Sequence, residues 1–309
     1  MSESAKSTMQ PTEKRNRILA LLGLIAVVLA AYFLWARPYQ FRWGATEEEV
    51  KRTMPGDELA ADPTFLATRA ITINGTPQQI WPWLMQMGYG RAGFYGYDIL
   101  DNGGQPSAER IWPQYQDYKV GDAVPMMPSV NLNFAVIEPY DAIVWRGTGS
   151  DVFTWALYPL ASNETRFVSR VRWSYHWSKP WLLPFDVFAE FTDHLAVRKL
   201  MQGVRDRAEG HIQPTLDTNI EFFIYVGTFL AFVWAARSVL RLPLAWTSWL
   251  VGVAGGLAWL LSWYGPVSLW TGALLSFLVI WAVRVEFRDA KRALIQEELR
   301  DKGHWKQKR

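Results

Sequence analysis

Hydrophobic residues in this 309-residue chain are concentrated in a few long runs. The first run, Ile18 to Pro38, contains one charged residue, Arg37, and a run of 42 residues from Leu242 to Val283 contains none. Because a helix needs about 20 apolar residues to cross a bilayer, the second run is long enough for two helices joined at Tyr264-Gly265-Pro266. A shorter run, Phe222 to Ala236, is bounded by charged residues that can reach the membrane surfaces. We therefore predict four transmembrane helices, at 18–36, 220–240, 243–263 and 267–284.

The first run also fits the pattern of a secretory signal peptide. A basic segment, Lys14 to Arg17, precedes it, and Val28-Leu29-Ala30 is typical of a cleavage site. The apolar residues continue beyond that site to Trp35, which is more typical of an uncleaved membrane anchor. We expect the anchor.

Between the first two predicted spans the pattern changes to short runs typical of strands. Residues 65–73 are rich in β-branched side chains and predict a strand. Thr76 and Pro77 suit the start of a helix that runs to about Met87. Further strands are predicted at Ala123–Met126, Leu132–Glu138, Ala142–Arg146, Val152–Tyr158 and Thr165–Trp177, followed by a long helix at about 185–209. No helix-length segment separates these later strands, so we expect an antiparallel meander.

The long helix defines the expected architecture. One apolar stripe runs along it, formed by Phe188, Phe191, Leu195, Met201, Val204 and Ala208. We predict an α+β fold over residues 43–212, in which a curved antiparallel sheet wraps around this C-terminal helix. A strongly bent sheet and a straight helix cannot touch along their whole length, so we expect an apolar cavity between them.

Charge is distributed unevenly along the chain. Residues 38–219 carry 16 Lys and Arg against 21 Asp and Glu, whereas the tails 1–17 and 285–309 are basic. A basic face for nucleic acid is therefore not indicated, although the pI is about 9.0. Positive flanks favour the cytoplasm, so we expect a multi-pass protein of the plasma (inner) membrane with both tails cytoplasmic and the domain outside. The absence of Cys excludes disulfides and thiol chemistry.

Several short motifs follow one another in register along the domain. They are Trp43–Thr46, Met54–Asp57, Ala67–Ile71, Ile80–Leu84, Gln86–Gly88, Gly90–Arg91, Gly93–Tyr95, Tyr97–Asp98, Leu100–Asn102, Lys119–Asp122 and Arg198–Glu209. Together they resemble the SRPBCC, or START-like helix-grip, superfamily, in its polyketide cyclase/dehydrase-like branch, here fused to transmembrane helices. The resemblance covers about 43–210 and implies the helix-grip fold. It leaves the activity open, because the superfamily includes lipid carriers, hormone receptors, cyclases and dioxygenase domains.

A glycine-rich string, Gly88-x-Gly90-x-x-Gly93, invites a dinucleotide-binding interpretation. That fingerprint needs a strand before its first glycine and a helix after its last. Here a predicted helix precedes the string and an aromatic segment broken by Gly96 follows it. We therefore expect the glycines to end the helix and permit tight turns, and we predict no cofactor.

The segment after these glycines supplies the first candidate ligand-binding residues. Tyr95, Tyr97 and Asp98 can orient a ligand by hydrogen bonds at a cavity mouth. The structural alternative is a short helix that packs its tyrosines on the core while Asp98 caps it or pairs with Arg91. With them we select further residues on the predicted strands and helices: Trp83, Trp145, Arg172, Phe191 and His194.

Arg172 and His194 each have a competing structural interpretation. Arg170, Arg172 and His176 share one face of the last predicted strand, and a buried arginine there would need an anionic partner or ligand. The aromatic face, which includes Trp173, is the more natural interior, so we expect the arginine face to be solvated. His194 could act as an acid or base, but a helix-surface or core role is more frequent.

The remaining patterns limit the function classes. No His lies at metal-ligand spacing, so we predict no metal, and no catalytic triad or P-loop stands out. Small residues in the last two predicted spans, Gly252, Gly255, Gly256 and Gly272 among them, favour close helix packing and a homo-oligomer. Three hypotheses remain: a membrane-anchored domain that binds a hydrophobic or amphipathic molecule such as a membrane lipid, a cyclase- or hydratase-like enzyme on a polyketide or isoprenoid, and a membrane sensor or scaffold.

Overall fold

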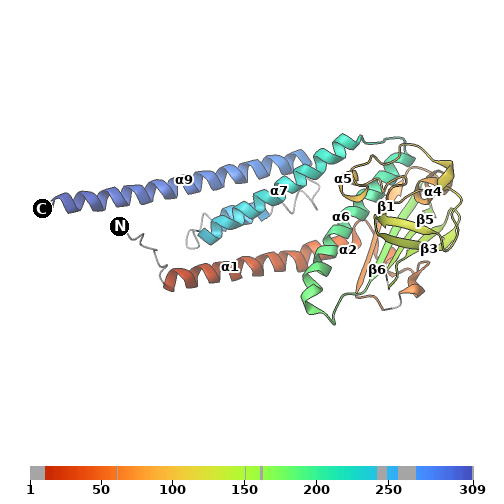
Figure 1. Cartoon of the computed structure of the whole chain (residues 1–309), viewed down its shortest axis with the longest axis horizontal. Helices are drawn as coiled ribbons and strands as arrows, with labels where there is room; N and C mark the ends of the chain where they lie inside the picture. The colour runs from red at the N-terminus through yellow and green to blue at the C-terminus, as the bar shows by residue number, and fades with distance from the viewer. Residues whose placement is uncertain are drawn as a thin grey trace. The chain divides into compact units, whose positions relative to one another are not determined.

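A computed structural model describes residues 11–60, 62–149, 151–160, 163–241, 249–256 and 269–307. The chain divides into two compact units. One unit is Arg37–Ile220, and the other combines Met1–Ala36 with Glu221–Arg309. The first unit contains the sheet and the whole of the range 43–212 that we predicted as the domain (Figure 1).

The sheet has six strands in the order β1-β6-β5-β4-β3-β2, and every neighbouring pair is antiparallel. Their bounds are β1 Phe65–Ile73, β2 Ala123–Met127, β3 Val130–Glu138, β4 Ala142–Arg146, β5 Val152–Pro159 and β6 Thr165–Trp173. The predicted meander is therefore confirmed from β2 to β6. We had predicted that the last strand would end at Trp177, but β6 ends at Trp173. Its partner β1 begins at Phe65, opposite Trp173, so β1 does not continue as its partner beyond that point.

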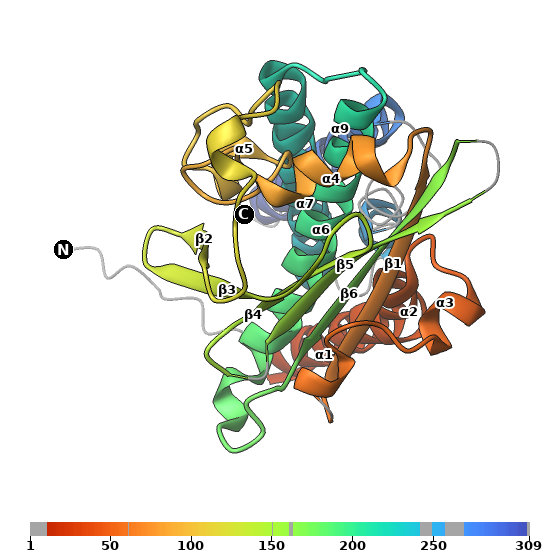
Figure 2. The same cartoon turned by 90° about the vertical axis from the view of Figure 1, so that its right-hand side faces the viewer.

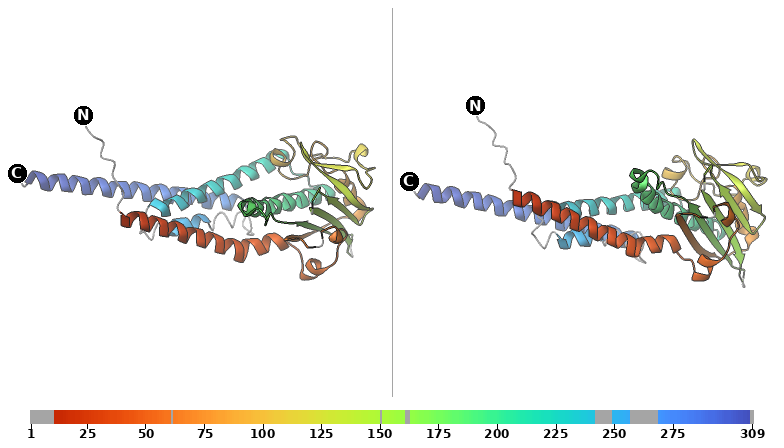
Figure 3. Two further views of the ribbon diagram at one scale, coloured as in Figure 1. Left: turned by 60° about the horizontal axis from the view of Figure 1, so that its bottom comes forward. Right: turned by 90° about the horizontal axis from the view of Figure 1, so that it is seen from below.

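Two of the helices cover one face of this sheet. α4 (Pro77–Met85) begins after the predicted N-cap Thr76, which forms a capping box with Gln79. The long helix α6 (Leu183–Ala208) lies across the same face, as Figures 2 and 3 show. The short elements of this unit are α2 Arg37–Arg42, α3 Glu47–Lys51, η2 Asp57–Leu59, α5 Asp98–Asp101, η3 Pro113–Tyr115 and η4 Pro180–Leu182.

The space between the sheet and α6 is filled with side chains. One apolar cluster joins them, and its largest members on the strands are Phe65, Phe134, Trp145 and Trp155, each at most 1% exposed. These rings contact other protein atoms over almost their whole surface, which leaves no space for a ligand beside them. Around these residues the expected apolar cavity is therefore absent, because their large aromatic rings fill the space that the curvature of the sheet opens.

The apolar stripe predicted for α6 is correct in its C-terminal half only. Met201 and Val204 are buried as expected, whereas Phe188 is 63% exposed. In the N-terminal half the buried residues are Asp186, Glu190 and His194. Our prediction assumed that apolar residues face the core along the whole helix. In this half of the helix, however, the neighbouring elements supply polar partners to the inward-facing side chains.

Two of the described helices are long and apolar enough to cross a membrane, at Ile18–Arg42 and Thr215–Arg237. The first comprises most of α1 (Pro11–Ala31), the π-helical turn η1 (Tyr32–Ala36) and α2, and the second belongs to α7 (Thr215–Arg241). Four spans were predicted, so this expectation is corrected. The predicted span 243–263 lies largely outside the described residues.

The predicted span 267–284 falls on α9 (Leu269–Gln307). The apolar part of α9, Ala273–Val285, is too short to meet the length of a span. At about 1.5 Å per residue it extends roughly 20 Å, whereas the hydrocarbon core of a bilayer is about 30 Å thick.

Candidate functional site

A small polar pocket lies beside α5 and the C-terminal half of α6. Its lining comes from four parts of the unit: the Tyr95–Asp98 segment, the loop around Ser107, α6, and the chain from Gln213 into the first turn of α7. The side chains that give the pocket its chemistry are Tyr95, Asp98, Lys199, Asp206, Arg207 and Thr215. Its volume of about 20 Å³ is enough for about one water molecule.

The carboxylate of Asp98 accepts three hydrogen bonds. Ser107 donates to its carboxylate from the backbone N–H at 3.0 Å and from the hydroxyl at 2.5 Å. Thr215 donates to the same carboxylate from its hydroxyl at 3.2 Å. Asp98 thus ties the loop after α5 to the start of α7. The structural alternative drawn from the sequence was that it caps the short helix or pairs with Arg91.

Tyr95 is held in an unusual backbone conformation. Its φ of 61° lies in the left-handed region, which L-residues adopt rarely. Its hydroxyl donates to the carbonyl of Trp83 at 2.9 Å, and burial raises the pKa of this phenol above its ordinary value. Gly203 of α6 makes this arrangement fit, because a Cβ there would lie 2.1 Å from the Tyr95 carbonyl oxygen.

Two cations from α6 enter the pocket lining. The Lys199 ammonium lies 5.5 Å from the ring centre of Tyr97 and hydrogen-bonds to the Gln213 side chain at 3.2 Å. The Arg207 guanidinium lies 4.3 Å from the ring centre of Tyr95, and burial lowers its pKa. These cations and the nearby carboxylates give the pocket both charge signs, which suits a ligand that donates and accepts hydrogen bonds.

Asp101 adds a titratable group behind the pocket. Burial, with a smaller contribution from the neighbouring Asp98 carboxylate, raises its pKa from 3.8 to about 7. Its carboxylate lies against Gly96, where a Cβ would meet Oδ2 at 2.3 Å. A carboxyl group with a pKa near 7 changes its charge around neutral pH, here close to the pocket-lining Gly96.

The glycine string forms a tight turn. Gly88 and Gly93 form an isolated antiparallel bridge, and both have positive φ, as does Gly90. The side chain of Arg91 folds back over Gly88 and donates to the carbonyl of Met87. These contacts agree with glycines that permit turns after a helix.

The other predicted ligand residues are not gathered at this pocket. Trp83 supports Tyr95 through an edge-on ring contact with centres 6.0 Å apart. Trp145 lies in the apolar core, and Phe191 is partly exposed on α6. His194 lies on α6 beside Tyr39, with ring centres 5.9 Å apart, and burial lowers its pKa well below its usual range.

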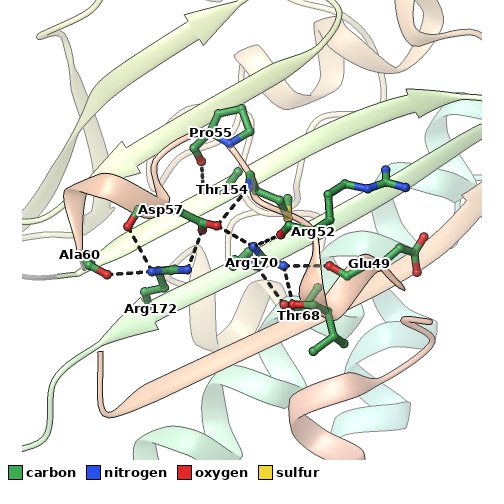
Figure 4. Close-up of polar contacts among 11 residues, drawn as sticks. Glu49, Arg52, Pro55, Asp57, Ala60, Thr68, Thr154, Arg170 and Arg172 are labelled. Atoms are coloured by element: carbon green, nitrogen blue, oxygen red, sulfur yellow. Dashed lines mark hydrogen bonds and ion pairs between the residues drawn. The ribbon is translucent and has the colours of Figure 1, made fainter. Parts of the chain in front are cut away.

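Arg172 lies with Arg170 on the opposite face of the sheet from α6. We had expected this face to be solvated, and that expectation was wrong. α3 and η2 cover it instead (Figure 4). Arg170 is 2% exposed and donates to Asp57 at 2.8 Å, to the Thr68 hydroxyl at 3.0 Å, and to the backbone carbonyls of Glu49, Val50 and Arg52. Arg172 pairs with the same carboxylate at 2.9 Å. The anionic partner that a buried arginine needs is thus internal.

Sequence reasoning missed most of the pocket. Lys199, Gly203 and Asp206 follow one another at spacings of four and three, which places them on one side of a helix. This polar side within a helix that enters the core is a signal that could have pointed to them. Ser107 and Thr215 carried no comparable signal. Among the described residues, no group of three His, Asp or Glu side chains could hold a metal ion.

No family model and no curated protein matches the sequence. Similar solved structures include a Staphylococcus saprophyticus protein (9% identity, TM-score 0.34), with 48% of this chain and 96% of that one covered. A polyketide-cyclase-like protein of Corynebacterium glutamicum has 15% identity and a TM-score of 0.26, covering 51% and 94%. The Aha1 dimer of Colwellia psychrerythraea has 15% identity and a TM-score of 0.29, covering 48% and 98%. By its own strand order and the position of α6, the unit Arg37–Ile220 has a helix-grip fold.

Proposed function

We propose that this chain is a membrane-anchored helix-grip protein that binds the polar group of a small amphipathic molecule in the pocket beside α5 and α6. The observation that carries the proposal is the pocket itself, in which Lys199 and Arg207 face a region that also holds Asp98 and Asp206. Burying charges of both signs at one place costs folding free energy. The same charges are suited to recognition of a polar group of a ligand.

The size of the pocket determines how a ligand can be held. The volume of about 20 Å³ admits only a small polar group, and the core beside Trp145 and Trp155 is filled. The apolar part of the molecule therefore lies outside the pocket. Membrane lipids are the natural source of such a molecule, because tethering raises their local concentration.

Anchoring is the second part of the proposal. Two apolar helices, Ile18–Arg42 and Thr215–Arg237, flank the sheet in the sequence. If both span, the two tails lie on one side and the domain on the other. Because both tails are basic, we place them in the cytoplasm. The expected location is the plasma (inner) membrane.

The ligand proposal is tested with the full chain purified in mild detergent. Mass spectrometry should find an amphipathic molecule bound to the wild type and at least tenfold less of it bound to Lys199→Gln. Lys119→Gln, which removes an exposed lysine that does not line the pocket, is the matched control and should retain the molecule. Equal amounts in all three proteins, or none in the wild type, would overturn the proposal.

Anchoring is tested separately in membranes. The chain should stay in the pellet after alkaline carbonate extraction. Because it has no Cys, the single variant Val120→Cys has one thiol, on a residue that is 63% exposed. A membrane-impermeant maleimide should label it in intact cells if the domain lies outside. Release by carbonate would contradict anchoring, and labelling only after lysis would contradict the sidedness.

A sensor is the second candidate function, and one observation favours it. Thr215 and Thr218, in the first turn of α7, line the pocket, and α7 is one helix from Thr215 to Arg241. A ligand here would contact the start of a candidate membrane span. Hydrogen exchange at residues 213–220 should be slower with the co-purified molecule than after its removal, and identical exchange would exclude this role.

A further inference from the structure

The N-terminal half of α6 has its polarity reversed relative to a helix on a water-soluble domain. Phe185 and Phe188 are 68% and 63% exposed. The buried residues of the same turns are Asp186 and Glu190, at 6% and 1% exposure. A helix between a protein core and water normally turns its apolar stripe inward. This half of α6 presents its apolar side chains to its surroundings.

Polar contacts fix this orientation. The backbone N–H of His176 donates to the Asp186 carboxylate at 3.0 Å, and the imidazole Nδ1 lies 2.8 Å from it. The Arg37 guanidinium donates to both carboxylate oxygens of Glu190, at 2.9 and 3.1 Å, and to the hydroxyl of Tyr175. Rolling the helix to bury its phenylalanines would break these bonds, so the outward face is a built feature of the fold.

Two exposed tryptophans come shortly before these phenylalanines in the sequence. Trp177 and Trp181 precede the helix and are 59% and 67% exposed. We call Trp177, Trp181, Phe185 and Phe188 the aromatic surface. An exposed lysine, Lys179, lies between the two tryptophans in the sequence. Tryptophan beside lysine is typical of segments at a membrane–water boundary.

The chain itself indicates what covers this surface. Arg37 is the only charged residue between Ile18 and Pro38, and it lies within the candidate span Ile18–Arg42. The same Arg37 is bonded to Glu190, which follows Phe188 by two residues. The aromatic surface is therefore held next to the point where an apolar helix meets its first charge. In a spanning helix that point lies at the edge of the hydrocarbon.

We infer that the aromatic surface docks the domain onto the lipid bilayer, with its four aromatic side chains in the interfacial region. This inference rests on the membrane anchoring proposed above. It adds a second contact with the same bilayer, made by the domain itself, which would fix the orientation of the domain relative to the membrane surface.

The experiment uses the full chain, whose lack of Cys allows a single spin label at any chosen position. Labels are placed by Phe185→Cys and Phe188→Cys on the aromatic surface, by Val120→Cys as an equally exposed control (63%), and by Leu29→Cys in α1 as an anchor reference. Each protein is reconstituted in vesicles of phosphatidylcholine and phosphatidylglycerol. Circular dichroism checks that each variant folds. Two positions on the aromatic surface are labelled, so that the experiment still gives a result if one of these variants does not fold.

Collision with oxygen, which concentrates in lipid, is compared with collision with a water-soluble nickel chelate. At positions 185 and 188 the ratio of oxygen to nickel collisions should exceed that at position 120 at least threefold. If the label at position 29 is in lipid while those at 185 and 188 match position 120, the inference is overturned and anchoring stands. If position 29 also lies in water, anchoring itself has failed. Low collision with both reagents at 185 and 188 would indicate a protein contact, such as a second copy, and would overturn the lipid assignment.

Discussion

Arg37 of α2 and Glu190 of α6 form a bidentate ion pair, with Nε 2.9 Å from one carboxylate oxygen and Nη2 3.1 Å from the other. The Glu190 side chain is 1% exposed, and that of Arg37 is 30% exposed. Paired hydrogen bonds of this kind are stronger and more directional than single ones. The contact connects the end of the apolar N-terminal segment to the long helix of the domain.

Replacing this glutamate should weaken the connection. We expect Glu190→Gln to lower the free energy of unfolding by about 1.5–3 kcal/mol, because a neutral amide offers the arginine one acceptor in place of two charged ones. Thermal unfolding of the detergent-solubilised full chain measures the effect. Glu47→Gln is the control, since Glu47 pairs with Arg42 on the surface and should contribute less than about 1 kcal/mol. Equal shifts in the two variants would contradict the prediction.

The arginine pair on the opposite face of the sheet depends on one carboxylate. Asp57 contacts both Arg170 and Arg172, at 2.8 and 2.9 Å, and Arg170 is almost fully buried. We expect Asp57→Asn to destabilise the domain by about 3–5 kcal/mol, because it leaves buried guanidinium charge without its anion. Urea unfolding monitored by tryptophan fluorescence gives the value.

The matched control for Asp57 is a surface ion pair in the same region. Glu48 pairs with Arg52 four residues later and is 83% exposed at its side chain. Glu48→Gln should change the stability by less than about 0.5 kcal/mol. An Asp57→Asn effect as small as that of Glu48→Gln would show that the network contributes nothing measurable.

Gly203 should not tolerate the smallest side chain. A Cβ at this position would lie 2.1 Å from the Tyr95 carbonyl oxygen and 2.6 Å from its Cβ. Alanine normally stabilises a helix by about 1 kcal/mol relative to glycine. We expect Gly203→Ala instead to destabilise the protein by about 1–3 kcal/mol and to displace the Tyr95 segment. Gly227→Ala in α7, where nothing lies within 4 Å, should be neutral or stabilising. Thermal unfolding distinguishes the two, and a stable Gly203→Ala protein would refute the close contact.

The stability of the domain should depend on pH through Asp101. Its pKa is raised to about 7 in the folded protein, from 3.8. Between about pH 4 and pH 7 the folded state therefore holds a proton that the unfolded chain has lost. The free energy of unfolding falls as pH rises through this window, by up to about 4 kcal/mol.

Asp101→Asn removes this proton and should flatten the dependence, so that the variant gains stability relative to the wild type as pH rises from 5 to 8. Melting temperatures of the full chain at these two pH values provide the measurement. Asp117→Asn, at an exposed carboxylate, should retain the wild-type slope. A wild-type slope that persists in Asp101→Asn would assign it to another group.

Local patterns predicted most of the secondary structure. β1 and β4 have the predicted bounds, Phe65–Ile73 and Ala142–Arg146, and Thr76 caps α4 as expected. These features depend on residues that are neighbours in the chain: side-chain alternation, β-branching and turn chemistry. The meander could be predicted for the same reason, since consecutive strands joined by short turns pair with each other.

The candidate site was predicted only in part. Tyr95 and Asp98 line the pocket, but Ser107, Lys199 and Thr215 join them from segments distant in sequence. Spacing along the chain carries no information on which of these segments meet. His194, which we had grouped with the tyrosines, lies beside Tyr39 instead.

The sequence alone determined the strands, the principal helices and which side chains share a face of each strand, because side-chain period follows from backbone geometry. Only the tertiary structure decided what covers each face. Arg170 is buried because residues 49–57 fold over it, and Phe188 is exposed because Arg37 holds Glu190 inward on the same helix. In both cases a charged side chain found a partner far away in the chain, because a charge can be buried only where it is paired.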